Sequence, residues 1–221
     1  MDLAALLDPT SAVIVIGGTG LATVLRCGLG NCRQAILALA QLGRCGFDAG
    51  TVRAEMAVQV REIQKDGLIR AHPHHSGDPD IDDATDAMIG ARSVEALVTA
   101  HAAQKARRTE AARRAAATLA QACELAPVFG LAGTLISLSQ MPGSGIGRES
   151  FGGAISMAVL TTLYGLLLAN VVLAPLARLV ERAAAAEERE REAIIAWLAA
   201  QVERCRLAVP QAGRKPRDEA A

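Results

Sequence analysis

Three histidines and four aspartates crowd into one short polar stretch, and imidazole and carboxylate groups are side chains that bind metal ions. The stretch reads HPHHSGDPDIDD, and its candidate ligands are His72, His74, His75, Asp78, Asp80, Asp82 and Asp83. Ligands packed so closely in a loop rich in proline and glycine seldom make a tight site, and no cysteine accompanies them. The aspartate series also lacks the glycine and glutamate of a calcium-binding loop. We therefore favour a solvated loop, with Asp82 or Asp83 as the N-cap of the next helix.

Other chemistries find less support in the sequence. Gly143, Gly145 and Gly147 resemble a phosphate-binding loop only in number, because no strand precedes them. The five cysteines contain no CxxC pair and read as reduced, small apolar side chains. No combination of serine, histidine and aspartate suggests a nucleophile. We expect no enzyme, no metal and no cofactor.

The composition excludes further classes of function. The chain has 221 residues, 23 basic and 23 acidic side chains, and a formal net charge of zero, which argues against a basic nucleic-acid binder. Aromatic residues make up only 2%, so a surface for stacking bases is also disfavoured. Hydrophobic residues make up 51%. Their placement therefore decides the class of protein.

Three apolar stretches lack charged side chains, at residues 9–25, 125–147 and 150–177. A helix of about 20 apolar residues crosses the hydrocarbon of a bilayer. The first stretch is short, but a signal peptide fits it poorly because Arg26 follows the apolar run instead of preceding it. We predict an all-α membrane protein with three transmembrane helices and long cytoplasmic helical extensions.

The basic residues predict the orientation of these spans. If all three stretches cross the membrane, every lysine and arginine except Arg148 falls on one side. We expect the protein in the cytoplasmic (inner) membrane of a bacterium. The positive-inside rule then places its N-terminus outside the cell membrane and its C-terminus in the cytoplasm.

The pattern along the chain divides it into four parts. Residues 1–28 form an N-terminal transmembrane helix, 29–122 a cytoplasmic helical segment, 123–180 a two-helix channel domain, and 181–221 a cytoplasmic helix with a disordered tip. Apolar spacing predicts helices over residues 33–42 and 52–63. We expect one helix to run from the aspartate-rich loop into the second span. Another should continue from the third span to Val209.

No aspartate, glutamate, lysine, arginine or histidine lies deep in any span, so this chain alone lacks the groups of a complete proton relay. Thr134, Thr161 and Thr162 are polar at depth, and the ordinary role of such hydroxyls is to bond the carbonyl one turn earlier. Pro127 and Pro175 interrupt the second and third spans, and each should free a carbonyl and kink its helix.

Two segments carry a resemblance to a known family. They read APVFGLAGTLISL at residues 126–138 and AVLTTLYGLLLANVVLAPLARLV at residues 158–180. Their order of Pro, Gly, GT, TT-x-YG and LAN-x(4)-PLA resembles the MotA/TolQ/ExbB proton-channel family. VIVIGGTGLATVL at residues 13–25 is similar to a span of the MotA branch, the flagellar-motor stator subunit. KDGLIRA at residues 65–71 resembles a cytoplasmic segment of that branch, with His72 where the branch has an acidic residue.

The resemblance implies a homo-oligomeric ring around single-span partners of the MotB, ExbD or TolR kind, which carry the ion-accepting aspartate. It implies transport of H⁺, or of Na⁺, coupled to mechanical work. Thr134, Thr162 and the neighbouring Thr161 match the ion pathway, and Pro127 and Pro175 match the prolines that couple ion flow to movement. The flagellar rotor would be a further partner. Candidates to face it are Arg61, Glu62, Lys65, Arg70 and Arg92.

One departure from the family leaves the branch open at this stage. MotA proteins usually have four spans, whereas this sequence shows three with the N-terminus outside, which is the ExbB/TolQ plan. The main hypothesis is a MotA-like flagellar stator subunit. The alternatives are an ExbB/TolQ-like energiser of an outer-membrane system and, from another class, a non-conducting helical membrane scaffold.

Overall fold

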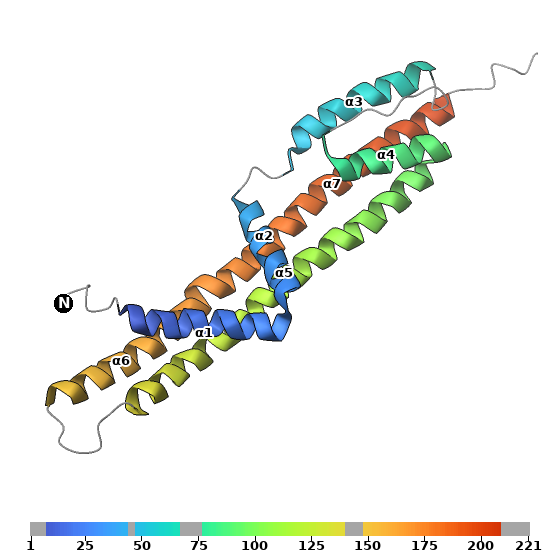
Figure 1. Ribbon diagram of the computed structural model, residues 1–221. Helices are drawn as coiled ribbons and strands as arrows, with labels where there is room; N and C mark the ends of the chain where they lie inside the picture. Colours follow the sequence, from blue (N-terminus) through green and yellow to red (C-terminus); the bar gives the residue numbers. More distant parts are fainter. Residues whose placement is uncertain (1–7, 44–46, 67–76, 140–147, 209–221) are drawn as a thin grey trace, which may run out of the picture. The chain divides into compact units, whose positions relative to one another are not determined.

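The computed structural model describes residues 8–43, 47–66, 77–139 and 148–208, and every element in this part is helical (Figure 1). The elements are α1 (Pro9–Cys27), α2 (Leu29–Leu42), α3 (Ala49–Asp66), α4 (Pro79–Ala91), α5 (Val94–Ser139), α6 (Arg148–Leu167), the π-helical turn η2 (Leu168–Leu173) and α7 (Ala174–Ala208). The predicted fold class is confirmed. Three helical segments are long and apolar enough to cross a membrane, namely Pro9–Cys27, one within Val94–Ser139 and one within Gly152–Arg204.

The chain divides into two compact units. Unit 1 contains residues 1–44 and 110–184, and unit 2 contains residues 45–109 and 185–221. Both α5 and α7 contribute segments to each unit. Each unit has its own buried core, so each is described separately.

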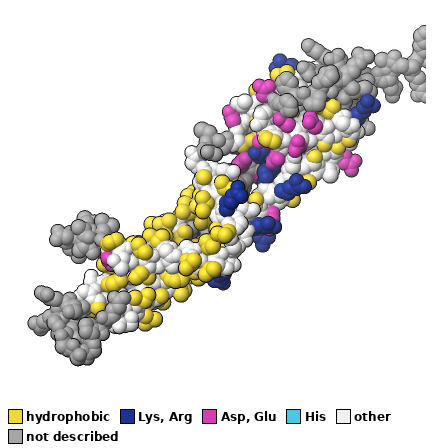
Figure 2. All heavy atoms as spheres, in the orientation of Figure 1, with side chains coloured by type: hydrophobic (Ala, Val, Ile, Leu, Met, Phe, Trp, Pro, Cys, Tyr) yellow, Lys and Arg dark blue, Asp and Glu magenta, His cyan; other side chains and the backbone are white. Residues whose placement is uncertain are grey.

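Unit 1 contains the three spans. In it, α1 packs against α6 and α2, and a small cluster built on Ala35, Leu119 and Val180 joins α2, α5 and α7. Large apolar side chains point outward from all three spans: Leu21 is 63% exposed, Leu135 69% and Val171 64%. Figure 2 shows hydrophobic side chains, in yellow, gathered over the α1 region. A surface of this kind requires an apolar surrounding, such as lipid or another protein surface.

Unit 2 has a conventional apolar core. Met56 of α3, Ile81 of α4, Leu97 of α5 and Leu198 of α7 are almost fully buried in one cluster. On the face shown in Figure 2, basic and acidic side chains lie on the surface of this unit. The predicted helices over residues 33–42 and 52–63 lie within α2 and α3, so both predictions are confirmed.

Aspartate side chains begin three of the helices. Asp8 accepts hydrogen bonds from the amides of Thr10 and Ser11 at the start of α1. Asp48 does the same for Gly50 and Thr51 at the start of α3. Each cap satisfies amides that have no partner within the helix.

The cap of α4 corrects a prediction. Asp78, not Asp82 or Asp83, is the N-cap, and it accepts from the amides of Asp80 and Ile81 at 3.1 and 3.2 Å. Pro79 follows it at the first helical position, where a proline costs nothing because that amide would be unpaired. The predicted loop therefore ends at Asp78. Its earlier part, residues 72–76, lies outside the described residues.

A second correction concerns the helix that follows. The single helix predicted from the aspartate-rich loop into the second span is interrupted, because Arg92 adopts a left-handed conformation with φ 53° and ends α4. The hydroxyl of Ser93 then accepts from the amide of Glu95 at the start of α5. From there the prediction is confirmed, since α5 continues through the second span to Ser139.

Candidate ion pathway and hinge

Helices α5 and α6 approach closely where small residues face each other. A Cβ added to Gly165 would lie 2.7 Å from the carbonyl oxygen of Ala126 and 3.0 Å from the Cα of Gly130. One added to Gly133 would lie 2.7 Å from the Cβ of Thr161. Glycine is therefore required at both positions for the backbones to come this close. This contact places the GT segment of α5 against the TT segment of α6.

The three threonine hydroxyls all bond within their own helices. Thr134 donates to the carbonyl of Leu131 at 2.6 Å, and Thr161 and Thr162 both donate to the carbonyl of Ala158, at 3.0 and 3.2 Å. Their oxygen lone pairs remain available as acceptors. The three side chains differ in exposure, because Thr161 is fully buried whereas Thr134 and Thr162 are partly exposed.

A π-helical turn precedes Pro175. Residues Leu168–Leu173 form η2, and the amide of Ala174 donates to the carbonyl of Ala169. Because proline has no N–H, the helix has one hydrogen bond fewer at this point, and a π turn is a common way to accommodate an irregularity. The sequence predicted a break near Pro175 but not this kind of turn.

A cysteine that the sequence reading treated as a small apolar residue contacts this turn. The thiol of Cys123 on α5 donates to the same carbonyl of Ala169, with a sulfur–oxygen distance of 3.3 Å. Pro127 lies one turn further along α5 and cannot donate to the carbonyl of Cys123, because it has no amide hydrogen. The two prolines therefore lie near a shared irregularity that joins α5 to the third span.

Known proteins match this chain in sequence. Residues 78–193 match the MotA/TolQ/ExbB proton channel family. A motility protein A from Cereibacter sphaeroides is 32% identical over 204 residues, covering 89% of this chain and 78% of that protein. The chain belongs to the MotA/TolQ/ExbB proton channel family. The resemblance read from its motifs is thus confirmed.

Further comparisons agree with this membership. A motility protein A from Borreliella burgdorferi is 37% identical over 59 residues, covering 27% of this chain and 23% of that protein. The flagellar MotAB stator complex from Bacillus subtilis has a chain with a TM-score of 0.76 at 20% identity, covering 92% of this chain and 81% of that one. C. jejuni MotAB has a chain with a TM-score of 0.76 at 16% identity, covering 98% of this chain and 89% of that one. These two structures share the fold.

Within this MotA/TolQ/ExbB family member, the five charged rotor-facing candidates do not form a described cluster. Arg61 is exposed on α3, and Arg92 is exposed at the left-handed end of α4. The side chains of Glu62 and Lys65, and the whole of Arg70, lie outside the described residues. In the described part of the chain, no group of histidine, cysteine, aspartate and glutamate is arranged to hold a metal ion.

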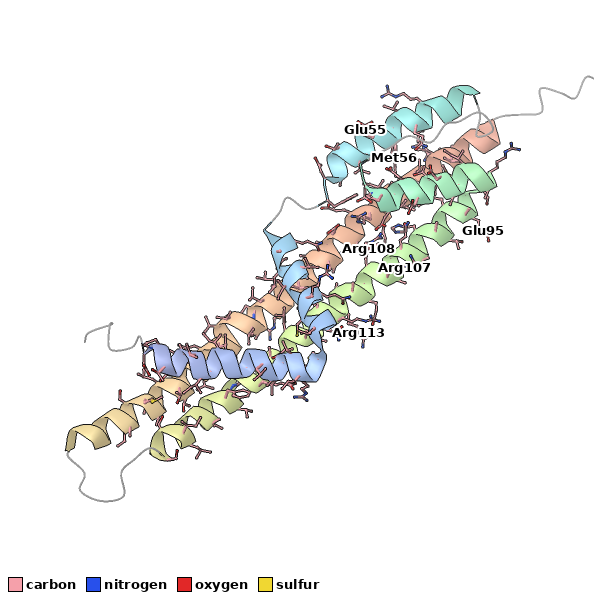
Figure 3. The ribbon with its side chains drawn as sticks, in the orientation of Figure 1. Glu55, Met56, Glu95, Arg107, Arg108 and Arg113 are labelled. Carbon is pink, nitrogen blue, oxygen red and sulfur yellow. The ribbon has the colours of Figure 1, made fainter. Side chains whose placement is uncertain are left out.

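The sequence did not predict a partly buried ionic cluster in unit 2. Arg108 of α5, labelled in Figure 3, forms two 3.0 Å hydrogen bonds with the carboxylate of Glu188 on α7 and also pairs with Asp80 on α4. Arg191 of α7 pairs with Asp78 at 2.6 Å. These partners are far apart in sequence, and the only available signal was the abundance of charges on α5 and α7.

Proposed function

We propose that this chain is a MotA-like subunit of a flagellar motor stator, resident in the bacterial inner membrane, that couples proton flow to mechanical work. The observation that carries the proposal is the 32% identity to a motility protein A across 89% of the chain. The solved neighbours are MotAB complexes as well. An ExbB/TolQ-like energiser is therefore not favoured.

The partner follows from the chemistry of the spans. A proton pathway needs a group that accepts the ion at membrane depth, and the spans of this chain carry no ionisable side chain there. We assign that group to an aspartate on a single-span partner of the MotB kind, enclosed by a ring of copies of this chain. The two neighbours named as MotAB complexes support this assembly.

Hydroxyl oxygens supply the ion pathway in this proposal. The partly exposed Thr134 and Thr162 would present acceptor lone pairs beside the partner's aspartate, and the buried Thr161 would hold the neighbouring backbone against Gly133. The ion is H⁺, with Na⁺ as the alternative, because threonine oxygens suit both.

Movement is assigned to the two prolines and to the charged cytoplasmic surface. Pro175 follows the π turn, and Pro127 lies one turn beyond Cys123, whose thiol contacts that turn. Since helical hydrogen bonds are interrupted at these points, the helices can bend there at low cost when the pathway changes. The charged candidates Arg61, Glu62, Lys65, Arg70 and Arg92 would face the rotor. The N-terminus lies outside and the C-terminus in the cytoplasm.

The test separates conduction from coupling. The chain and its partner are placed in vesicles for measurement of proton flux, and in motile cells that lack their own stator for measurement of swimming. Flux that survives loss of the partner's aspartate would contradict the proposal. Flux that requires the aspartate while swimming is never restored would favour an ExbB/TolQ-like energiser.

Pro175→Ala tests the hinge in the same assays. We expect flux to be retained and swimming to be lost, because alanine restores the missing amide and allows a regular helix. Pro9→Ala is the matched control, since Pro9 occupies the first turn of α1 and should leave both readouts unchanged. Loss of the assembled complex in Pro175→Ala would instead point to a role in folding.

A further inference from the structure

The strongest unexplained feature of the molecule is a buried histidine in the ionic cluster of unit 2. His101 of α5 is 7% exposed, and its Nε2 lies 3.5 Å from Oε1 of Glu188 on α7. That nitrogen has no hydrogen-bond partner of normal geometry. Glu188 is already occupied, because both of its oxygens accept from Arg108. Two basic side chains, His101 and Arg108, thus lie against one carboxylate.

The groups around His101 come from three helices. Lys105 and Arg108 lie on α5, Glu188 and Glu192 on α7, and Asp80 on α4 reaches the cluster through Arg108. With the imidazole neutral, these groups carry two positive and three negative charges. A proton on His101 would complete the balance of charge, but only by placing a cation in a buried position.

Burial decides which form of the imidazole the fold favours. Desolvation lowers the pKa of His101 below its usual value of 6.5, Glu188 opposes this by favouring the cation, and Arg108 acts in the same direction as burial. His101 is therefore uncharged at neutral pH. Because the unfolded chain takes up this proton more readily, the stabilising effect of the neutral histidine is complete above pH 6.5 and is lost as the pH falls below it.

The cluster holds the start of α4 in place. Arg108 bridges Asp80 in the first turn of α4 to Glu188 on α7. An imidazolium formed at His101 would attract the same carboxylate that Arg108 uses, and the two cations would repel each other. Loosening of Arg108 would then release its hold on Asp80.

We propose that His101 is an acid-operated latch in unit 2, which leaves Glu188 to Arg108 when uncharged and competes for it when protonated, loosening α4. The ligand of the latch is a proton from the solution. The proposal goes beyond the proposed function and is independent of it, because it can be tested on the chain without partner or rotor. In the proposed orientation, unit 2 faces the cytoplasm, so the latch would respond to cytoplasmic acidification.

The chain contains a built-in reporter for this experiment. Trp197 is its single tryptophan, packs against the core cluster that includes Ile81 and Met88 of α4, and lies under Arg53 of α3. Its fluorescence should therefore respond when α4 loosens. We would titrate the whole chain in lipid nanodiscs from about pH 7.5 to about pH 5.5, above the usual range of carboxylates.

The expected result is a reversible change in Trp197 emission centred below the usual histidine pKa of 6.5, and its absence in His101→Gln. The matched control replaces the other three histidines, His72, His74 and His75, with glutamine and should titrate like the wild type. Glu188→Gln removes the carboxylate for which Arg108 and His101 compete, so the pH-dependent change in Trp197 emission should be lost. Hydrogen exchange of the α4 amides, corrected for the intrinsic effect of pH, provides the second readout.

Several outcomes would overturn the latch. An unchanged titration in His101→Gln, or its loss in the triple histidine variant, would assign the proton to another group. A Glu188→Gln variant that responds to pH like the wild type would show that the latch does not depend on this carboxylate. If His101→Gln fails to fold, the loss of the response in Glu188→Gln and the wild-type exchange still decide. Exchange of α4 and Trp197 emission that are both insensitive to pH would exclude the device.

Discussion

Thr161 and Thr162 illustrate how much two neighbouring identical residues can differ. Both hydroxyls donate to the carbonyl of Ala158, yet Thr161 is buried against Gly133 while Thr162 is partly exposed. The sequence could predict that these hydroxyls bond within the helix, since that is their ordinary behaviour in apolar surroundings. It could not predict which of them keeps an accessible oxygen, because exposure depends on how α5 packs against α6.

Thr162→Val should lower proton flux strongly, because valine keeps the shape of the side chain but removes the oxygen that we assign to the ion pathway. Thr162→Ser keeps the oxygen and should conduct at a rate close to that of the wild type. The measurement is flux in vesicles that contain the chain and its partner. Equal flux in the valine and serine variants would show that the hydroxyl is not part of the pathway.

Asp78 shows a second limit at the scale of single residues. Four aspartates compete as the cap of α4, and the sequence alone favoured Asp82 or Asp83. In the structure the cap is Asp78, which is followed by Pro79 at the first helical position and also pairs with Arg191. That second partner lies more than a hundred residues away, so local pattern alone could not identify it.

At the scale of elements, long regular patterns were predictable and interruptions were not. The three spans, α2 and α3 follow from apolar spacing and length. The left-handed Arg92 and the π turn before Pro175 break otherwise regular helices. A non-glycine residue rarely adopts the left-handed conformation, and nothing local marks Arg92 for it. A π turn depends on contacts such as that of Cys123 with Ala169.

Gly165→Ala tests the close approach of α5 and α6. The added methyl group would lie 2.7 Å from the backbone oxygen of Ala126, which cannot move aside as a flexible side chain could. We expect a loss of about 1–3 kcal/mol in stability, seen as a lower midpoint of thermal unfolding in detergent.

Gly153→Ala is the matched control on the same helix, because a Cβ there meets nothing within 4 Å. It should unfold at the wild-type temperature or slightly above, since alanine favours helix. If both variants unfold at the same temperature, the packing of α5 against α6 is looser than the structure indicates.

At the scale of the whole molecule, the distribution of charges predicts a membrane orientation. Arg148 is the one basic residue between the second and third spans. Every other basic residue lies on the side that we assign to the cytoplasm. The division into two units was less accessible to sequence, because its boundaries fall inside the continuous helices α5 and α7.

Labelling of a cysteine placed at Ser144 tests this orientation. Ser144 lies in the chain between the second and third spans, and we expect an impermeant thiol reagent to label it from outside intact cells. The five native cysteines are first replaced, and a cysteine at the exposed Arg182 serves as the control that should react only after the cells are opened. The reverse pattern would invert the topology.

The hydrogen bonds of the threonine hydroxyls have a consequence for cells that make this chain in excess. Thr134, Thr161 and Thr162 all direct their hydrogens to carbonyls of their own helices, so none of them is poised to hand a hydrogen onward in a relay. A copy that is not assembled with its partner should then conduct no protons. Surplus subunits would then stay in the membrane without dissipating the ion gradient across it.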